Sequence, residues 1–150
     1  MSRLTLPRTV SAAVLAAAGV AVSLPGPAAA QPVASPGDRS VAVTVRNHTD
    51  VRLTLSDDDI VEGDWTKEPP RTIKRLAVVK FGSESTEDEG GTEATVTYDT
   101  TYGEVEFYWR NPWTRDNEFT CDAPDELECE VKGGGLGTHP KVTFEIRDAF

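Results

Sequence analysis

The sequence predicts an all-β fold, a single-domain antiparallel β-sandwich with one disulfide. Three observations lead to this prediction. Apolar and polar residues alternate with period two in several short segments, turn-forming residues separate these segments, and no segment has a helical period. Six or seven short strands at this spacing are typical of a sandwich. About 120 residues follow the predicted N-terminal export signal, and this length is enough for one hydrophobic core.

The chain begins with the pattern of a cleavable secretory signal. Arg3 and Arg8 supply the positive start, an apolar stretch runs from Val10 to Leu24, and Ala28–Ala30 form the small-residue cleavage pattern. A retained membrane anchor is the alternative, but the stretch is shorter than the roughly 20 apolar residues that a spanning helix needs. We therefore expect cleavage after Ala30 and a secreted, extracellular protein.

After the signal at residues 1–30, residues 31–39 contain two prolines and a glycine and are expected to form a flexible leader, with the sandwich at 40–150. Strands at 41–45 and 51–55 are predicted to form a hairpin around a polar turn. The sequon Asn47-His48-Thr49 lies in this turn and is interpreted as turn chemistry. The remaining elements are a long loop at 57–71, a strand at 73–81, an acidic loop at 83–91, strands at 92–98 and 104–109, an irregular segment at 111–124, a short strand at 127–132, a loop at 133–140 and a last strand at 142–146.

Alternation also predicts which side chains form the core. The expected core residues are Val43, Leu53, Val96, Phe107 and Phe144. Trp109 shares its strand face with Phe107, so we assign it to the core, and Tyr108 must then point the opposite way.

Charge excludes one class of function. All 25 acidic residues follow the signal, whereas two of the 15 basic residues lie within it, so the processed chain carries a formal charge of −12. Such a surface repels phosphate backbones, and we expect no nucleic-acid partner. The sequence also lacks the Lys/Arg cluster that draws proteins to anionic lipid.

The two cysteines, Cys121 and Cys129, predict a disulfide. An even count in an exported chain favours pairing, which would stabilise the fold by roughly 2.5 kcal/mol in the chain-entropy model. A two-thiolate metal site is the alternative, but no third or fourth ligand lies nearby in the sequence.

Catalytic motifs are not found. His48 and His139 are the only histidines, and neither lies in a nucleophile, phosphate-binding or metal-binding motif, so we expect no enzyme, no cofactor and no metal. The acidic runs at Asp57–Asp59 and Glu84–Glu89 could ligate calcium, but neither has the spacing of a known calcium loop. Solvated charge is the favoured interpretation of both runs.

Aromatic side chains are the candidate binding residues. Trp65 and Trp113 are predicted to lie in two loops near prolines, either as packed lids over the core or as ligand contacts. Trp and Tyr rings suit a membrane interface, and they can also hold a quaternary ammonium group such as phosphocholine. Tyr108 and Phe119 complete the candidate lipid-binding set.

Several further stretches follow one another in a definite order. They are Val45–Thr49 with Leu53, Glu62–Trp65 with Pro69–Pro70 and Ile73, Phe81 with Ser83–Ser85, Gly90–Tyr98, and Phe107–Trp113 with Asn117. In order and spacing they resemble the aegerolysin-like family, including its bacterial crystal-protein relatives. The chain departs from the family pattern at Thr114–Asp116, where a glycine is common, and in its cysteine pair.

The resemblance implies a haemolysin-like β-sandwich that recognises membrane lipids, with loops bearing Trp65 and Trp113 facing the membrane. Some members of the family act with a larger pore-forming partner, so a two-component toxin system is implied as well. The negative charge restricts the expected lipids to zwitterionic or sphingolipid types. The alternative function is an exported, non-catalytic protein-binding or inhibitor-like domain, which a liposome sedimentation assay would distinguish.

Overall fold

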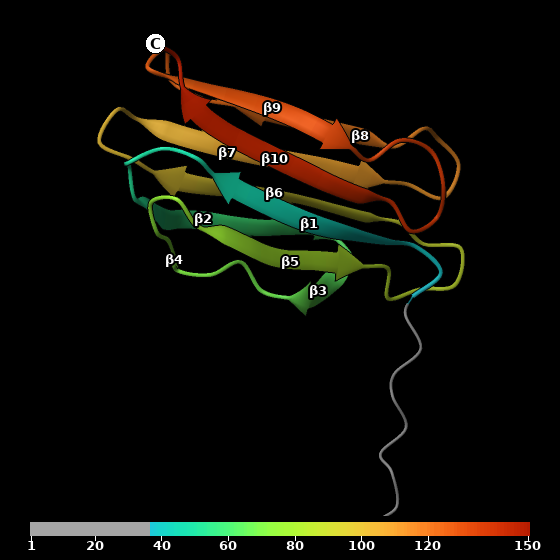
Figure 1. Ribbon diagram of the computed structural model, residues 1–150. Coiled ribbons are helices and arrows are strands. Elements are labelled where there is room, and N and C mark those ends of the chain that lie inside the picture. The colour runs from blue at the N-terminus through green and yellow to red at the C-terminus, as the bar shows by residue number, and fades with distance from the viewer. Residues whose placement is uncertain (1–36) are drawn as a thin grey trace, which may run out of the picture. The chain divides into compact units, whose positions relative to one another are not determined.

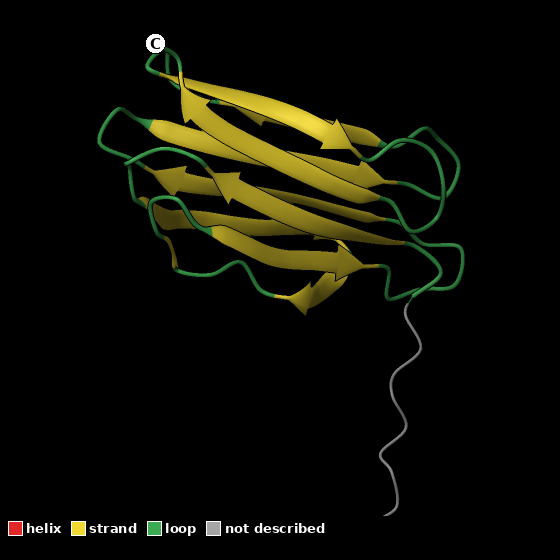
Figure 2. Ribbon diagram, viewed as in Figure 1, coloured by secondary structure: helices red, strands yellow, loops and turns green. Residues whose placement is uncertain are grey.

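The computed structural model describes residues 37–150, so the export signal predicted at residues 1–30 and the start of the leader lie outside the described residues. Residues 37–150 contain ten strands and no helix (Figures 1 and 2). The strands are β1 (Ser40–Asn47), β2 (Leu53–Glu62), β3 (Asp64–Lys67), β4 (Thr72–Ile73), β5 (Val78–Glu84), β6 (Thr92–Asp99), β7 (Glu104–Asn111), β8 (Glu118–Asp122), β9 (Leu127–Gly133) and β10 (Lys141–Asp148).

The strands form two five-stranded sheets that pack as a sandwich. The first sheet has the order β3-β5-β1-β10-β9, and the second has the order β4-β2-β6-β7-β8. Neighbouring strands are antiparallel except for β1 and β10, which pair in parallel. The predicted all-β sandwich is therefore confirmed, with more strands than expected and one parallel pair.

The core lies between the two sheets. All five residues predicted to form it are buried, as is Trp109. The Phe107 ring stacks on Phe144 with 5.0 Å between centroids. The indole Nε1 of Trp109 donates a 2.8 Å hydrogen bond to Ser83 Oγ, so the polar edge of this buried ring has a partner.

The predicted hairpin between the first two strands is wrong, because β1 belongs to the first sheet and β2 to the second. The chain crosses between the sheets at a corner built on buried Asn47. Its Nδ2 donates to Val51 O (2.7 Å) and Lys74 O (3.1 Å), while its Oδ1 accepts from the Thr49 amide (3.0 Å) and hydroxyl (2.7 Å). These bonds satisfy the backbone where it leaves β1, so no strand-to-strand ladder is needed there.

Three predicted boundaries also differ from the structure. Residues 57–71 were expected to form a loop, but Asp57–Asp59 continue β2 opposite β6 and residues 64–67 form β3. The aspartates are accommodated because their side chains are exposed and only their backbone pairs with β6, with bulges on either side. The strand expected at 73–81 is divided between β4 and β5, which lie in opposite sheets. The irregular segment at 111–124 contains β8, an edge strand paired with β7.

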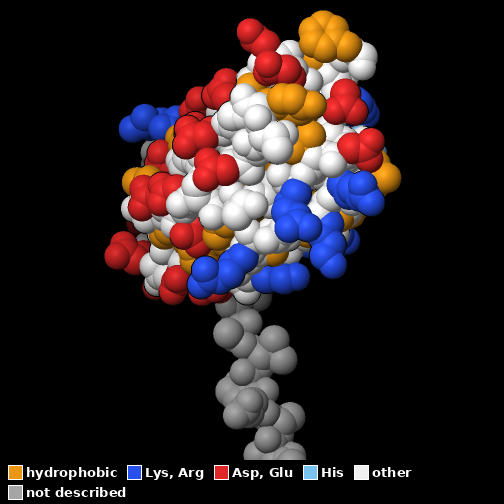
Figure 3. Space-filling view, turned by 90° about the vertical axis from the view of Figure 1, so that its left-hand side faces the viewer, with side chains coloured by type: hydrophobic (Ala, Val, Ile, Leu, Met, Phe, Trp, Pro, Cys, Tyr) orange, Lys and Arg blue, Asp and Glu red, His pale blue; other side chains and the backbone are white. Residues whose placement is uncertain are grey.

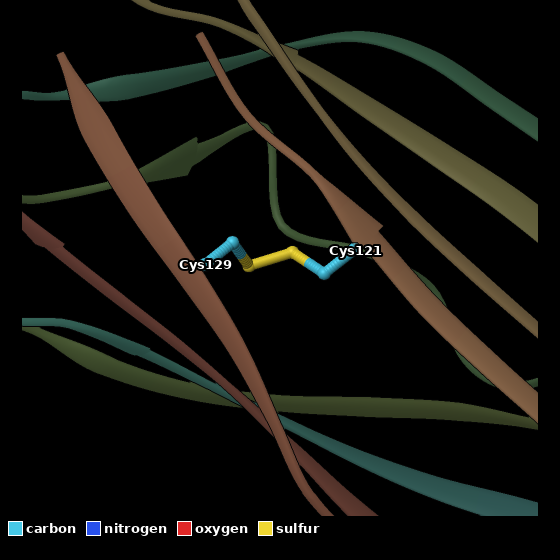
Figure 4. Close-up of a disulfide and its surroundings, with 2 residues drawn as sticks. All are labelled: Cys121 and Cys129. Atoms are coloured by element: carbon cyan, nitrogen blue, oxygen red, sulfur yellow. A yellow bond between two sulfur atoms is a disulfide. The ribbon is translucent and has the colours of Figure 1, made fainter. Parts of the chain in front are cut away.

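Cys121 and Cys129 form the predicted disulfide (Figure 4). Cys121 lies in β8, the edge of the second sheet, and Cys129 lies in β9, the edge of the first. The bond therefore joins the two sheets along one open side of the sandwich.

Candidate functional site

The loops at one end of the sandwich hold the most exposed aromatic of the candidate set. This end, which we call the tryptophan end, consists of loops 85–91, 112–117 and 134–140, and lies at the right of Figure 1. The three loops follow β5, β7 and β9, which all run toward the same end. A loop that leaves a rigid sheet is a common position for binding residues.

Trp113 lies in the loop after β7 and is 40% exposed. The guanidinium carbon of Arg39 lies 5.3 Å from the centre of its ring. Arg39 also donates to Asn111 Oδ1 (2.9 Å) and to the carbonyl of Trp113 (3.0 Å). A cation–π contact from Arg39 thus holds the ring in place, although Arg39 was predicted to belong to the flexible leader.

Leu136, in loop 134–140 of the tryptophan end, is an exposed apolar side chain as well, at 81% exposure. Its loop is anchored by Asn117, whose Nδ2 donates to the carbonyls of Gly135 (2.8 Å) and Gly137 (3.0 Å). Asn111 adds a bond to Thr138 O at 2.8 Å. The sequence interpretation missed Leu136, although a lone leucine among four glycines was a usable signal, since nothing in such a loop buries it.

The other three candidate residues are not comparably exposed. Trp65 lies in β3 rather than in a loop, is half-buried, and meets Trp109 edge-on with 5.9 Å between centroids. Phe119 is also half-buried, and its ring lies so close to Gly134 that an added Cβ would be 2.6 Å from it. Trp65 and Phe119 therefore extend the core toward this end, and their role in lipid contact stays a prediction.

Tyr108 lies on the outer face of the second sheet, opposite to Trp109, as predicted. Its hydroxyl donates to Glu93 Oε1 at 2.9 Å. Partial burial, followed by this bond to a carboxylate, raises the pKa of Tyr108 to about 12, so the phenol stays protonated at physiological pH. The structure does not bring Tyr108 together with Trp113.

Acidic side chains line two hollows at the tryptophan end. One shallow hollow there, of about 220 Å³, is lined by residues that include Glu62 and Glu87. A second, of about 410 Å³, is lined by residues that include Asp38, Glu84 and Asp88. Within residues 37–150, no group of three or more His, Cys, Asp or Glu side chains is placed to hold a metal ion.

A serine–histidine pair also lies at this end. Ser40 Oγ is 2.9 Å from His139 Nδ1, and the pair is solvent-exposed. In a catalytic triad the second ring nitrogen of the histidine is held by a third residue. In residues 37–150 no such bond to His139 Nε2 is present, and the Ser40–His139 pair joins the start of β1 to loop 134–140.

Comparison with solved structures supports an aegerolysin-like fold. The lipid binding protein Nakanori is similar with a TM-score of 0.65 and 16% identity, covering 75% of this chain and 72% of that one. IP-1A from Alcaligenes faecalis is similar with a TM-score of 0.57 and 16% identity, covering 77% of this chain and 96% of that one. At such identities the likeness shows a shared fold.

No protein-family model matches the chain. Among curated proteins, an uncharacterized protein of Dictyostelium discoideum is 27% identical over 115 residues, which cover 75% of this chain. The match covers 10% of that protein, so the chain spans about a tenth of the length of this relative. Among the described residues, no helix is long and apolar enough to cross a membrane.

Proposed function

We propose that the protein is a lipid-binding module that contacts membranes through its tryptophan end. The observation that carries this proposal is the exposure of Trp113 and Leu136 on two loops held in place by Asn111 and Asn117. An exposed indole and an exposed leucine at the same end of the domain have the amphipathic character that anchors proteins at a membrane interface. The fold shared with a protein described as lipid binding supports the same conclusion.

The charges around Trp113 favour a zwitterionic or sphingolipid headgroup. The acidic hollows at the same end of the sandwich would repel a net-negative membrane surface. The Arg39 guanidinium above the ring offers a positive group to the phosphate of such a headgroup. A choline group would approach the ring from the side that Arg39 leaves free.

The module acts by binding and without turnover in this proposal. Export, as residues 1–30 predict, would bring it to the surface of other cells. A pore-forming protein partner, as the family resemblance implies, would then use it as the membrane-recognition half of a toxin system. Sedimentation with vesicles tests the binding step alone and does not depend on such a partner.

The test is sedimentation with vesicles of phosphatidylcholine, alone and with sphingomyelin and sterol. Trp113→Ala and Leu136→Ser should each lower partitioning into the vesicles by about tenfold. This is the lower end of the effect expected when a large apolar side chain is no longer buried in the membrane. Both should leave the thermal midpoint within a few degrees, since both side chains are exposed. Binding should also change little with ionic strength, because apolar contacts carry it.

Tyr102→Ala is the matched control, because Tyr102 is 49% exposed in the loop between β6 and β7, at the opposite end. It should bind like the unaltered protein. Trp65→Ala is expected to lower stability instead, since Trp65 packs on buried Trp109. If folded protein sediments with none of these vesicles, the lipid proposal fails and the protein-binding alternative replaces it.

A further inference from the structure

The expectation that the sequence lacks a Lys/Arg cluster is wrong, because the basic residues are distributed unevenly along this acidic chain. Between Glu68 and Glu84 the sequence contains Arg71, Lys74, Arg75 and Lys80 and no acidic residue. This segment forms β4, the loop at 74–77 and most of β5. Its loop lies at the end of the sandwich opposite to the tryptophan end, at the lower left of Figure 1.

The fold adds a basic residue from another segment to this loop. Arg52, just before β2, lines a hollow of about 340 Å³ together with Lys74, Arg75 and one carboxylate, that of Asp50. All three basic side chains are exposed, and none forms an ion pair with any residue in 37–150. Figure 3, which faces this end, shows several Lys and Arg side chains gathered toward its lower right, while most Asp and Glu side chains lie toward the left and the top.

Two exposed apolar side chains accompany these charges. Leu76 is 69% exposed and Val78 is 55% exposed. Val78 also lines a neighbouring hollow of about 370 Å³ with Pro70, Lys67 and Lys80. Basic and apolar side chains are therefore exposed together at this end of the sandwich, in a group that we call the basic tip and define as Arg52, Lys74, Arg75, Leu76 and Val78.

The loop that carries Leu76 is held in a fixed and strained conformation. Leu76 has a φ of 55°, in the left-handed region that a branched apolar residue rarely adopts. Its amide donates to Thr49 O at 3.2 Å, and buried Asn47 donates to Lys74 O at 3.1 Å. The corner between the sheets thus presents Leu76 to solvent in a preformed position, and such local strain commonly marks a functional site.

We propose that the basic tip is a docking surface for membranes that carry anionic phospholipid headgroups. Charge complementarity argues for this partner, since Lys and Arg near a negatively charged leaflet each contribute to binding. The exposed Leu76 and Val78 argue for a bilayer over a soluble anion, because only the bilayer offers an apolar layer beneath its phosphates. This surface is separate from the tryptophan end and does not rest on the function proposed there.

The experiment measures partitioning onto phosphatidylcholine vesicles with and without about one-third phosphatidylglycerol. The unaltered protein should bind the anionic vesicles more tightly, and this gain should disappear on raising the salt from about 0.05 to about 0.5 M. The double variant Lys74→Ala/Arg75→Ala should lose about thirty-fold in partitioning onto anionic vesicles. The double variant should keep its binding to sphingomyelin vesicles, whereas Trp113→Ala should keep the tighter binding to anionic vesicles. The two proposals can therefore be refuted independently of each other.

Lys141→Glu is the charge-matched control, because it also lowers the net charge by two but lies at the start of β10, at the other end. It should retain the anionic gain. Leu76→Asn removes the apolar side chain but introduces a residue that tolerates the left-handed conformation. It should weaken vesicle binding about tenfold and leave binding to soluble heparin unchanged. The proposal is overturned if phosphatidylglycerol brings no gain, if Lys141→Glu matches the double variant, or if Leu76→Asn leaves vesicle binding unaltered.

Discussion

Asn47→Ala is the substitution that tests the corner between the two sheets most directly. The side chain is 1% exposed and makes four hydrogen bonds, two as a donor through Nδ2 and two as an acceptor through Oδ1. Its partners are the carbonyls of Val51 and Lys74 and the amide and hydroxyl of Thr49. Alanine would leave these groups without the partner that now satisfies them.

The magnitude follows from those four bonds. At about 1 kcal/mol for each bond, Asn47→Ala should lower the free energy of unfolding by about 4 kcal/mol. Because buried carbonyls would be left unpaired, the loss should lie toward the upper part of the range around this value. For a domain of this size that corresponds to a fall of about 15 °C in the thermal midpoint. Urea unfolding followed by tryptophan fluorescence measures the free energy, and differential scanning calorimetry measures the midpoint.

The control is His48→Ala, one residue further along the same corner. His48 is exposed, and its side chain forms no hydrogen bond within residues 37–150, so the change in stability should stay within about 0.5 kcal/mol. If Asn47→Ala costs no more than His48→Ala, the corner is held by something other than its side-chain bonds. The reasoning about how the sheets are joined would then be refuted.

Three further predictions concern stability. Phe107→Ala should destabilise by about 3–5 kcal/mol in urea unfolding, because the ring is fully buried. Cys121→Ser/Cys129→Ser should lose about 2.5 kcal/mol, and non-reducing mass spectrometry should find the unaltered protein two protons lighter than its dithiol form. The pKa of Glu145 is lowered, first by the hydrogen bond from Lys132, so its contribution is present near neutral pH and lost as the pH falls through the folded-state pKa. Glu145→Gln should therefore flatten the fall of the thermal midpoint between neutral pH and about pH 3.

Period-two alternation predicted the central strands well because it reports a local physical requirement. Val96 and Phe107 are neighbours across β6 and β7, and both are fully buried between the sheets. Any strand with one face in the core must alternate in this way, whichever strand it pairs with. The pattern is therefore readable without knowledge of the partners.

Pairing between distant strands is not readable in the same way. Alternation in residues 41–45 and 51–55 is equally compatible with a hairpin and with a corner that joins two sheets. The difference lies in partners far along the chain, since β1 pairs with β5 and β10. Asp57–Asp59 illustrate the same limit, because their composition indicates a loop while pairing with β6 holds them in a strand.

The candidate site was only partly predictable for a related reason. Trp113 was identified from its loop and its neighbouring proline, and it is exposed as a contact residue would be. Trp65 has the same sequence signal, but β3 places it against Trp109. Sequence alone does not tell which large aromatic finds a buried partner, because that partner comes from a strand more than 40 residues away.

The net charge of the whole chain does not describe either end of the sandwich, and the geometry explains why. An eight-residue strand such as β1 spans about 26 Å, whereas the Debye length at physiological salt is about 8 Å. The two ends of the sandwich are therefore screened from each other, and a membrane responds to the end that faces it. Acidic groups around Trp113 and basic groups around Leu76 would then select different lipids on one small domain. Binding through the first end should change little with salt, and binding through the second should weaken steeply.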